Sequence, residues 1–366
     1  MSAVADLLTQ LVRIPSVNPE GDPGTDRTGE AECAKFIADF LTNLGAEVQL
    51  PEILPGRPNV IGRFPSDRPG KPRLLLAPHT DTVSVLGMTI EPFSGEQRDG
   101  RIWGRGSSDT KGPMAAMLQA LSDLKDVIPT LSHEIWFAGL MSEEAGQHGS
   151  ISLASSETFD FVLVGEPTSL EIVHTHKGSR RIFLHAAGVA VHSSTPDKGK
   201  NAIEPVLDAL VFLKAEFHRR FGDLTHPILG RTTMSIGTIR GGSKVNIVPE
   251  GCDAAVDIRT LPGQDIDGFV ADLKARFPEV TFTTAGAAPL WTDPENAIIQ
   301  KLRGCGAGLT GAPWFCDAAP FSERGVPAVA LGPGSIAQAH TADEWIAISD
   351  LEAGLTFYKN FLNQLA

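Results

Sequence analysis

The sequence has few cysteines, and none of the four lies close to another. Without a C-x-x-C pair, the chain lacks the usual ligand spacing of a zinc ribbon. Widely scattered thiols also do not indicate the disulfide framework of a small secreted domain. We therefore interpret them as ordinary thiols: Cys33, Cys252, Cys305 and Cys316.

Basic residues are also scarce, with 31 Lys and Arg against 44 Asp and Glu, which gives a formal net charge of −13. A nucleic-acid surface needs clustered Lys and Arg, and the sequence has no such cluster. We therefore expect no nucleic-acid partner. The acidic excess is typical of a solvated surface, although carboxylates gathered around cations would also produce it.

No uninterrupted apolar run reaches the ~18 residues that a membrane span needs. The first residues, MSAVADLLTQLVRIPSVNPEG, predict a short amphipathic helix and a loop broken by proline, without the basic start and small-residue cleavage site of a signal peptide. We therefore expect a cytoplasmic protein with no membrane partner. Apolar residues make up 42% and charged residues 20% of 366 residues, which is typical of a soluble globular protein with room for two domains.

Segments with helical and strand character alternate in the first half of the chain. This alternation predicts an α/β fold with helices on both faces of a sheet. The sheet should be mixed, because some connections are too short for a crossover helix. The predicted strands are AEVQL, NVIGRF, RLLLAPH, HEIWFAGL and FDFVLVG, and the predicted helices lie in TGEAECAKFIADFLTNLG and GPMAAMLQALSDLK.

From about Lys177 the predicted order changes to β-α-β-β-α-β, which is typical of a ferredoxin-like α+β domain. After GAAPLWTDPEN the chain returns to a helix, the strand PAVALGPG and a terminal helix that can complete the first domain. We therefore predict one domain of residues 1–176 and 286–366, interrupted by an inserted domain of residues 177–285. Such an insertion is tolerated because domain termini usually lie close together.

Carboxylates and imidazoles gather at the predicted strand ends and glycine-rich loops of the first domain. Open α/β sheets bind ligands at the carboxyl ends of their strands, so we expect these groups to converge. Taken singly, a histidine at a strand end is usually structural and tandem glutamates are usually a solvated turn. Together they supply the mixed nitrogen and oxygen donors that zinc-like cations prefer. The groups are His79, Asp81, Asp109, Glu143, Glu144, Glu166 and His340.

Two further motifs favour structural interpretations. GRGSSD suggests a phosphate loop, but it lacks the complete G-x-G-x-x-G pattern and the later acidic partner of a dinucleotide site. The HTH segment would place His174 and His176 on one strand face, but no carboxylate partner is evident. We therefore expect neither a dinucleotide nor a second metal site there.

Five motifs in this order resemble those of the dinuclear zinc aminoacylase and carboxypeptidase family, which includes acetylornithine deacetylase and succinyl-diaminopimelate desuccinylase. The motifs are HTDTV, GRGSSDTKG, SEEAG, VGEPTS and QAHTADE. The resemblance extends over nearly the whole chain, including the inserted domain. One departure is Pro78, where relatives often have glycine before the histidine. It affects the backbone geometry and leaves the ligand set intact.

The resemblance implies a catalytic first domain that binds two divalent metal ions, which are zinc or, with similar donors, cobalt. Asp109 would bridge the two ions. His79 and Glu166 would complete the ligands of one ion, and Glu144 and His340 those of the other.

Two more carboxylates of the first domain then have interpretations of their own. Asp81 should accept the free N–H of His79, because alternate residues of an extended backbone point the same way. Glu143, left without a ligand role, can take a proton from the attacking water and deliver it to the leaving nitrogen. A non-catalytic metal-binding module would not need Glu143, so its presence favours an enzyme.

The inserted domain and one glycine-rich loop contain the candidate substrate-binding residues. An Asn before a strand often caps a turn, and a strand Arg often faces water. The resemblance nevertheless implies that His192 stabilises the oxyanion and that Asn246 and Arg259 hold the substrate carboxylate, which suits the planar fork of Arg. Gly334, in the loop before His340, would contact substrate. The resemblance also implies a homodimer through the inserted domain, with His192 serving the other chain.

The segment GPGSIAQAHTADE looks most like the acetylornithine deacetylase branch. We therefore expect a metallo-amidohydrolase that hydrolyses the amide bond of an N-acyl amino acid, with Nα-acetylornithine as the first substrate to test. The alternatives are a succinyl-diaminopimelate desuccinylase, a dipeptidase or carboxypeptidase of the same family, and a non-catalytic metal-binding module. The sequence identifies no residue that would contact an ornithine amine.

Overall fold

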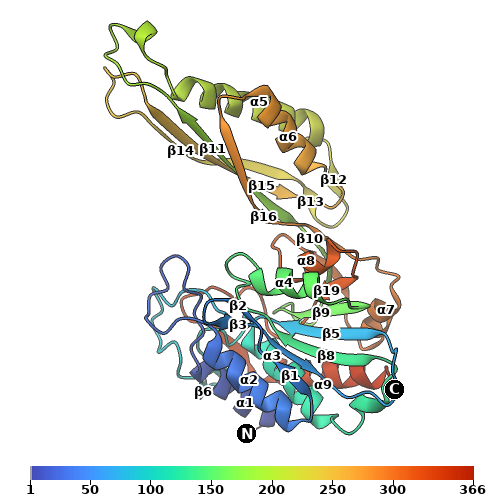
Figure 1. Ribbon diagram of the computed structural model, residues 1–366. Helices are drawn as coiled ribbons and strands as arrows, with labels where there is room; N and C mark the ends of the chain where they lie inside the picture. The colour runs from blue at the N-terminus through green and yellow to red at the C-terminus, as the bar shows by residue number, and fades with distance from the viewer. Residues whose placement is uncertain (1) are drawn as a thin grey trace. The chain divides into compact units, whose positions relative to one another are not determined.

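The computed structural model describes residues 2–366 and divides into two compact units. The smaller unit comprises His176–Leu290 together with Ala312–Phe315, and the larger unit comprises the rest of the described chain (Figure 1). The smaller unit thus ends at Leu290 rather than at the predicted residue 285, and a short segment returns to it later.

The larger unit is built on a mixed sheet, as the sequence predicted. The strand order is β1-β4-β8-β5-β9-β19-β10-β17, and β18 pairs with β10. The strands β8, β5, β9 and β19 are parallel to one another, whereas β1, β4 and β10 pair antiparallel to their neighbours. The bounds are β1 Glu47–Gln49, β4 Val60–Arg63, β5 Arg73–Pro78, β8 Glu134–Gly139, β9 Phe161–Gly165, β10 Ile172–His176, β17 Leu290–Trp291, β18 Leu309–Ala312 and β19 Ala328–Ala330.

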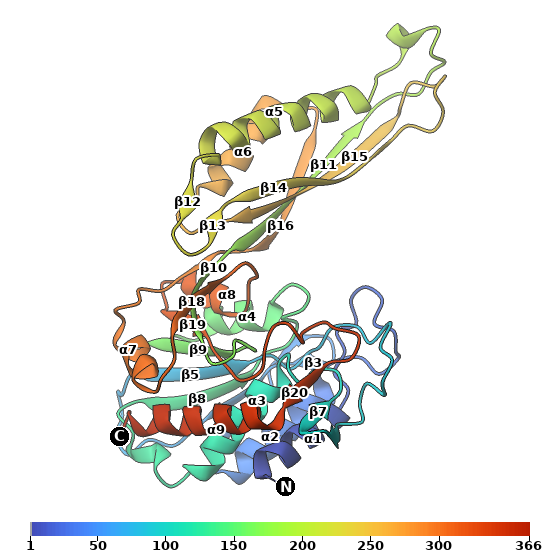
Figure 2. The same ribbon diagram turned by 180° about the vertical axis from the view of Figure 1, so that it is seen from behind.

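Helices cover both faces of this sheet (Figures 1 and 2). Leu74 and Leu76 of β5 belong to the main core with α1, α2, α3, α7 and α9. Side chains alternate along a strand, so Leu75 and Ala77 point to the other face, where α8 packs on β9 and β19 and α4 packs on α8. The helices are α1 Ala3–Arg13, α2 Ala31–Asn43, α3 Lys111–Asp123, α4 His148–Ser156, α7 Ala297–Gly304, α8 Ala318–Ser322 and α9 Ile348–Asn363.

The smaller unit is an antiparallel sheet in the order β14-β15-β11-β16, with α5 and α6 packed on one face. This is the ferredoxin-like arrangement that the element order predicted. Along β11, Ile182 and Leu184 are buried whereas Phe183 is 42% exposed, so the opposite face of the sheet is open. The bounds are β11 Gly178–Ala187, α5 Ile203–Phe221, β14 Thr233–Gly241, β15 Gly251–Thr260, α6 Ile266–Arg276 and β16 Thr281–Ala287.

Several short elements were not anticipated. The helix α4 begins after Gln147, whose backbone is left-handed, and the helix α8 has only 5 residues. Most of the other missed elements are strands too short to show an alternating pattern. One of them, β20, pairs with β7 and so brings the segment after His340 beside the segment before Asp109. The short strands are β2 Glu52–Leu54, β3 Arg57–Pro58, β6 Glu96–Arg98, β7 Arg101–Trp103, β12 Thr225–His226, β13 Gly230–Arg231 and β20 Trp345–Ala347.

None of the four cysteines, all of which lie within residues 2–366, forms a disulfide, in agreement with their interpretation as ordinary thiols. Within residues 2–366, none of the helices combines the length and the apolar character that crossing a membrane requires.

Candidate metal centre and catalytic residues

The candidate site lies where neighbouring parallel strands end. In the register of β5 and β9, Pro78 lies opposite Gly165, so His79 and Glu166 follow equivalent positions on adjacent strands. His79 also forms a bridge with Leu140, which follows β8 and precedes the tandem glutamates. These groups therefore meet at the carboxyl edge of the sheet, which is the usual ligand-binding edge of α/β proteins.

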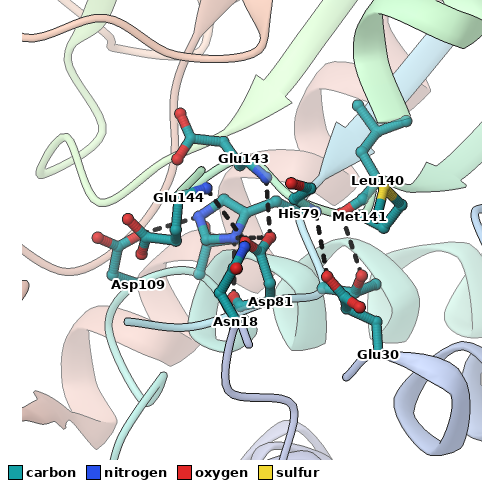
Figure 3. Close-up of polar contacts among 12 residues, drawn as sticks. Asn18, Glu30, His79, Asp81, Asp109, Leu140, Met141, Glu143 and Glu144 are labelled. Carbon is teal, nitrogen blue, oxygen red and sulfur yellow. Dashed lines mark hydrogen bonds and ion pairs between the residues drawn. The ribbon is translucent and has the colours of Figure 1, made fainter. Parts of the chain in front are cut away.

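Asp109 lies between two histidines. Its Oδ1 is 3.0 Å from Nε2 of His79, and its Oδ2 is 3.2 Å from Nε2 of His340. The same His340 nitrogen is 3.2 Å from Glu144, and one potential ligand atom from each of His79, Asp109 and Glu144 lies within 4.8 Å of the others (Figure 3). A carboxylate that presents one oxygen to each of two imidazoles has the arrangement required of a bridging ligand.

Glu166 supplies an independent test of whether cations fit this site. The residue is buried, and its Oε1 has no hydrogen-bond partner among residues 2–366. Burial, followed by the neighbouring charge of Asp109, raises the pKa of Glu166 well above its ordinary value. A buried carboxylate without a partner is costly, and a divalent cation would remove that cost. The donor set therefore fits divalent cations.

The burial and close approach of charged groups also shift the pKa values of the other ionisable residues of the site. Hydrogen bonds with Asp109 and Glu144 raise the pKa of His340 to about 10. Burial is the largest influence on Asp109 and would raise its pKa, but His340 and His79 outweigh it and lower the pKa below the ordinary value. Burial, followed by the charges of Glu166 and Glu144, raises the pKa of Glu143 well above normal. In Figure 3 the carboxylate of Glu143 points away from Asp81 and Glu144.

Asp81 holds the turn that carries both glutamates. Its Oδ1 accepts a hydrogen bond from the backbone N–H of Glu143 at 3.0 Å, and its Oδ2 accepts one from the N–H of Glu144 at 3.1 Å (Figure 3). Nδ1 of His79 is 2.9 Å from the backbone oxygen of Asp81 but 3.5 Å from its carboxylate. The expected pair is therefore adjacent, yet the nearer acceptor for His79 is a carbonyl and the carboxylate mainly fixes the tandem-glutamate turn.

More buried polar groups hold this turn from behind. The Nδ2 of Asn18 donates to Asp81 at 2.8 Å. Glu30 forms a two-pronged ion pair with Arg57 and also accepts the N–H of Ser142 at 3.2 Å. Sequence reasoning missed these residues because they lie far from the turn in the chain and belong to none of its motifs.

Asp317, at the start of α8, is a further buried carboxylate that sequence reasoning missed. Its Oδ1 accepts hydrogen bonds from Ser150 and Gln147, just after the tandem-glutamate turn. Its Oδ2 has no hydrogen-bond partner within residues 2–366, and burial raises its pKa to about 7. In the sequence, Asp317 is only an aspartate after Cys316, and it does not lie at a characteristic spacing from another acidic residue.

Gly334 has a structural explanation that does not involve substrate. Its φ is +83°, in the left-handed region, and a Cβ there would lie 2.8 Å from Oγ of Ser108. Its carbonyl accepts a hydrogen bond from the N–H of Ser169 at 2.7 Å. These constraints require glycine, and contact with substrate stays a prediction.

The two histidines of the HTH segment are both buried. Nδ1 of His174 lies 3.0 Å from the carbonyl of Thr292, and Nδ1 of His176 lies 3.0 Å from that of Lys177. Burial lowers the pKa of His176 to about 4. These contacts agree with the structural interpretation.

The candidate residues of the smaller unit lie at two places within it. His192 and Asn246 are exposed on neighbouring loops, joined by a 3.0 Å hydrogen bond from Ser193 to the carbonyl of Asn246. Arg259 lies near the other end of β15, where its Nε donates to Asp257 at 2.9 Å. A strand rises about 3.3 Å per residue, so Gly251 and Arg259 are about 26 Å apart. One smaller unit therefore does not place Asn246 and Arg259 on the same small carboxylate.

Imidazoles and carboxylates gathered at one strand edge, beside the further carboxylate of Glu143, are typical of the class of metal-dependent hydrolases. The model of peptidase family M20/M25/M40 matches residues 75–364. The chain is 32% identical over 368 residues to acetylornithine deacetylase of Proteus mirabilis (strain HI4320), which covers 95% of this chain and 92% of that protein. The chain belongs to peptidase family M20/M25/M40.

Solved structures show the same fold. The M20 family metallo-carboxypeptidase Sso-CP2 of Sulfolobus solfataricus superposes with a TM-score of 0.75 at 19% identity, covering 99% of both chains. The YXEP protein of Bacillus subtilis, described as a dinuclear metal binding peptidase from the M20 family, gives a TM-score of 0.67 at 14% identity, covering 99% of this chain and 97% of that one. The predicted fold and family are thus confirmed, and the chain is an enzyme of the metallopeptidase and amidohydrolase type.

Proposed function

We propose that this enzyme hydrolyses the amide bond of N-acyl amino acids and that Nα-acetylornithine is the first substrate to test. The observation that carries the proposal is Glu143, a carboxylate beside the donor cluster that points away from the neighbouring donors. A purely structural metal site has no use for such a group. The relative named acetylornithine deacetylase supports an acetyl group and an α-amino acid.

The proposed ligands of two divalent cations are Asp109 as the bridge, His79 and Glu166 on one side, and Glu144 and His340 on the other. Zinc is the proposed metal, and cobalt suits the same donors. When bound, such cations lower the pKa of a coordinated water towards ~7 and polarise the carbonyl of the scissile amide. A cation held there would give Glu166 the partner that its Oε1 lacks among the described residues.

The remaining proton transfers belong to Glu143. As a carboxylate it takes a proton from the attacking water, and as a carboxylic acid it delivers that proton to the leaving nitrogen. Burial, which does not depend on the cations, is the largest cause that raises the pKa of Glu143, and it favours retention of the proton between the two transfers. Asp81 keeps the glutamate in place through the N–H of residue 143 itself.

The smaller unit is proposed to form a homodimer and to contribute to substrate binding. β14 is an edge strand of its sheet, and Ile236 and Ile239 on it are 42% and 51% exposed. An open, partly apolar edge is a common pairing surface. His192 is proposed to stabilise the oxyanion, and Arg259 and Asn246 to bind carboxylate. Because His192 and Arg259 lie at opposite ends of β15, a substrate that touches both must be held by two chains.

The test is a hydrolysis screen of acetyl-, succinyl- and peptidyl-amino acids, with the metal content measured in each sample. Chelation should abolish hydrolysis, and two equivalents of zinc per chain should restore it. Glu143→Gln should retain its metal and lose about 10²- to 10⁴-fold in kcat, the usual contribution of a general base. Glu352→Gln, the same change at an exposed position of α9, is the control.

Each other outcome has a definite meaning. Full activity in protein shown to be free of metal contradicts the mechanism. A higher kcat/KM for N-succinyl-diaminopimelate or for dipeptides identifies the desuccinylase or the peptidase alternative. Bound metal with no hydrolysis of any substrate identifies a non-catalytic module. The proposed cytoplasmic location is tested separately, by fractionation of cells that produce the protein.

A further inference from the structure

The loop of residues 104–109, which has the sequence GRGSSD and carries Asp109, surrounds the carboxylate of Glu344. This glutamate follows His340 by four residues and is fully buried. Its Oε1 accepts the backbone N–H groups of Ser108 at 2.8 Å and Asp109 at 2.9 Å. Its Oε2 accepts the N–H of Gly106 at 3.0 Å and Nη1 of Arg105 at 2.9 Å. Each oxygen thus receives two donors.

This arrangement explains why the sequence GRGSSD resembles a phosphate-binding loop. Successive backbone N–H groups directed at one point form a concavity suited to an anion. In this chain the anion is the protein's own carboxylate. The loop therefore does not serve a phosphate group, in agreement with the incomplete glycine motif.

Glu344 also joins the two segments that carry the proposed bridge and one proposed terminal ligand. Its backbone carbonyl accepts the N–H of Gly104, and the next residue begins β20, which pairs with β7. One residue thus connects the Asp109 loop to the His340 segment through both side chain and backbone. The 3.2 Å approach of Asp109 Oδ2 to His340 Nε2 occurs between these connected segments.

We propose that Glu344 is a positioning residue of the metal centre, which fixes the Asp109 loop against the His340 segment so that Asp109 can face both histidines. The inference rests on the proposed function in that it takes Asp109 and His340 as metal ligands. Charge-assisted hydrogen bonds to a buried carboxylate are stronger than neutral ones, so this contact can hold a loop whose glycines allow other conformations.

Glu344→Gln is the sharpest variant. An amide offers one oxygen and one NH₂ group, so one pair of donors keeps its acceptor while the other pair meets a donor. The affinity for zinc alone, measured by competition with a chelator, should fall by about 10- to 100-fold, as expected for the loss of a partner behind a ligand. Glu344→Asp keeps the charge but is one methylene shorter, so its affinity for zinc should lie between those of the wild type and Glu344→Gln. Glu352→Gln on α9 should bind zinc like the wild type.

Amide hydrogen exchange provides a readout that does not depend on the variants folding. In the metal-free wild type, the N–H groups of Gly106, Ser108 and Asp109 should be protected as strongly as sheet amides, although they lie in a loop. In Glu344→Gln, protection should be lost at one pair of donors first. Rapid exchange of all three amides in the folded wild type would overturn the proposal. Zinc affinity equal to wild type in a folded Glu344→Gln protein would also overturn it.

The zinc-affinity and hydrogen-exchange measurements need no substrate, so they separate the inference from the proposed function. Zinc binding that depends on Glu344, in a protein that hydrolyses none of the substrates, contradicts only the function. Hydrolysis together with zinc binding that is indifferent to Glu344 contradicts only the inference. At saturating zinc, Glu344→Gln should recover much of its kcat with KM little changed, whereas general damage to the fold would not be repaired by metal.

Discussion

Several carboxylates in and beside the candidate site have a pKa above the ordinary value, although that of Asp109 is lowered. Burial is the first cause at Glu143, Glu166 and Asp317, and the carboxylates near them add to it. Groups this close titrate as a set, because the charge of one changes the proton affinity of the next. Such a set is unfavourable without cations, and this gives the metal-free protein a characteristic pH dependence.

We predict that the metal-free protein becomes less stable as the pH rises from 5 to 8. Burial first raises the pKa of Asp317 from 3.8 to about 7, so the folded state binds a proton that the unfolded chain has lost, and stability falls as pH rises between those values. His340, raised from 6.5 to about 10 by Asp109 and Glu144, contributes stability below pH 6.5 that is lost as the pH approaches 10. Both effects have the same sign, and together they outweigh His176, whose pKa burial lowers from 6.5 to about 4 and whose contribution therefore rises with pH only up to 6.5. Thermal unfolding in the presence of a chelator measures the sum.

Asp317→Asn isolates one contribution. The amide oxygen can still accept the hydroxyl of Ser150, but the position no longer titrates, so Tm should fall less steeply between pH 5 and 7. The same change at the exposed Asp126 is the control and should leave the slope unaltered. Zinc should also flatten the profile, because the cations neutralise the carboxylates. An equal slope in Asp317→Asn and wild type would show that Asp317 is ionised throughout this range.

The sequence predicted the proposed metal ligands better than the residues that support them. His79, Asp109, Glu144 and Glu166 belong to local motifs beside strand ends. The structure brings potential ligand atoms of the first three within 4.8 Å of one another, and it places Glu166 after the strand next to that of His79. Asp317 and Glu344 act through contacts with backbone amides and with side chains distant in the chain, and no spacing in the sequence encodes such contacts. Their burial is visible only in the folded structure.

At the scale of elements, the turn of the tandem glutamates depends on groups from other segments. Its residue Ser142 has a left-handed backbone, with φ of +63°, which is unfavourable for a residue other than glycine. Glu30 and Asp81 hold successive backbone N–H groups of this turn. The turn is therefore kept in its conformation by buried carboxylates on both sides.

We predict that Asp81→Asn lowers kcat by about 10- to 100-fold with a smaller change in KM. The single oxygen of the amide can accept either the N–H of Glu143 or the donors of Glu144 and Asn18, and its NH₂ group then faces the donor or donors that remain. The base and one proposed ligand are then displaced together, so zinc affinity should fall as well. Steady-state kinetics at several zinc concentrations separate the two effects, and Asp126→Asn again controls for the change of charge. Unaltered kcat and zinc affinity would contradict this function of Asp81.

The longer strands were predicted from the sequence, whereas the shortest ones were not. β5, β8 and β9 contain five or six mostly apolar residues bounded by polar ones, and all three were expected. β6, β7 and β20 contain three residues each, which is too short for an alternating pattern to stand out. Yet β7 and β20 bring Glu344 to the Asp109 loop, so the missed elements include those that organise the site.

At the scale of the whole molecule, the candidate substrate-binding residues of the smaller unit lie toward opposite ends of its sheet. His192 and Asn246 lie beyond one end of β15, and Arg259 lies near the other, about 26 Å away along a strand that rises about 3.3 Å per residue. If all three act on one substrate, the site must be completed by a second copy. A twofold dimer makes that exchange reciprocal, because the same surface is used by both partners.

Mixed dimers test this sharing directly. His192→Ala and Glu143→Ala, each nearly inactive alone, are mixed in equal amounts after dissociation and allowed to reassociate. Random pairing makes about half of the dimers mixed, and in each of these the His192→Ala chain keeps its own Glu143 and receives His192 from its partner. One of two sites is then whole, so about a quarter of wild-type activity should return if the sites act independently. If His192 serves its own chain, none should return.

The matched control is the double variant, with both substitutions in one chain, mixed equally with the wild type. If His192 acts across the dimer, the wild-type chain of a mixed dimer lacks its partner's histidine, so only the wild-type homodimers remain active and about a quarter of the activity survives. If His192 acts within its own chain, each mixed dimer keeps one whole site and about half survives. If His192 acts across the dimer, each of the two mixtures should show about a quarter of wild-type activity. If His192 acts within its own chain, the mixture of single variants should show no activity, and the mixture of double variant and wild type should show about half. Subunit exchange is verified by mass spectrometry of differently labelled chains. With exchange verified, no activity in the first mixture and half of the activity in the second would show that each chain uses its own His192.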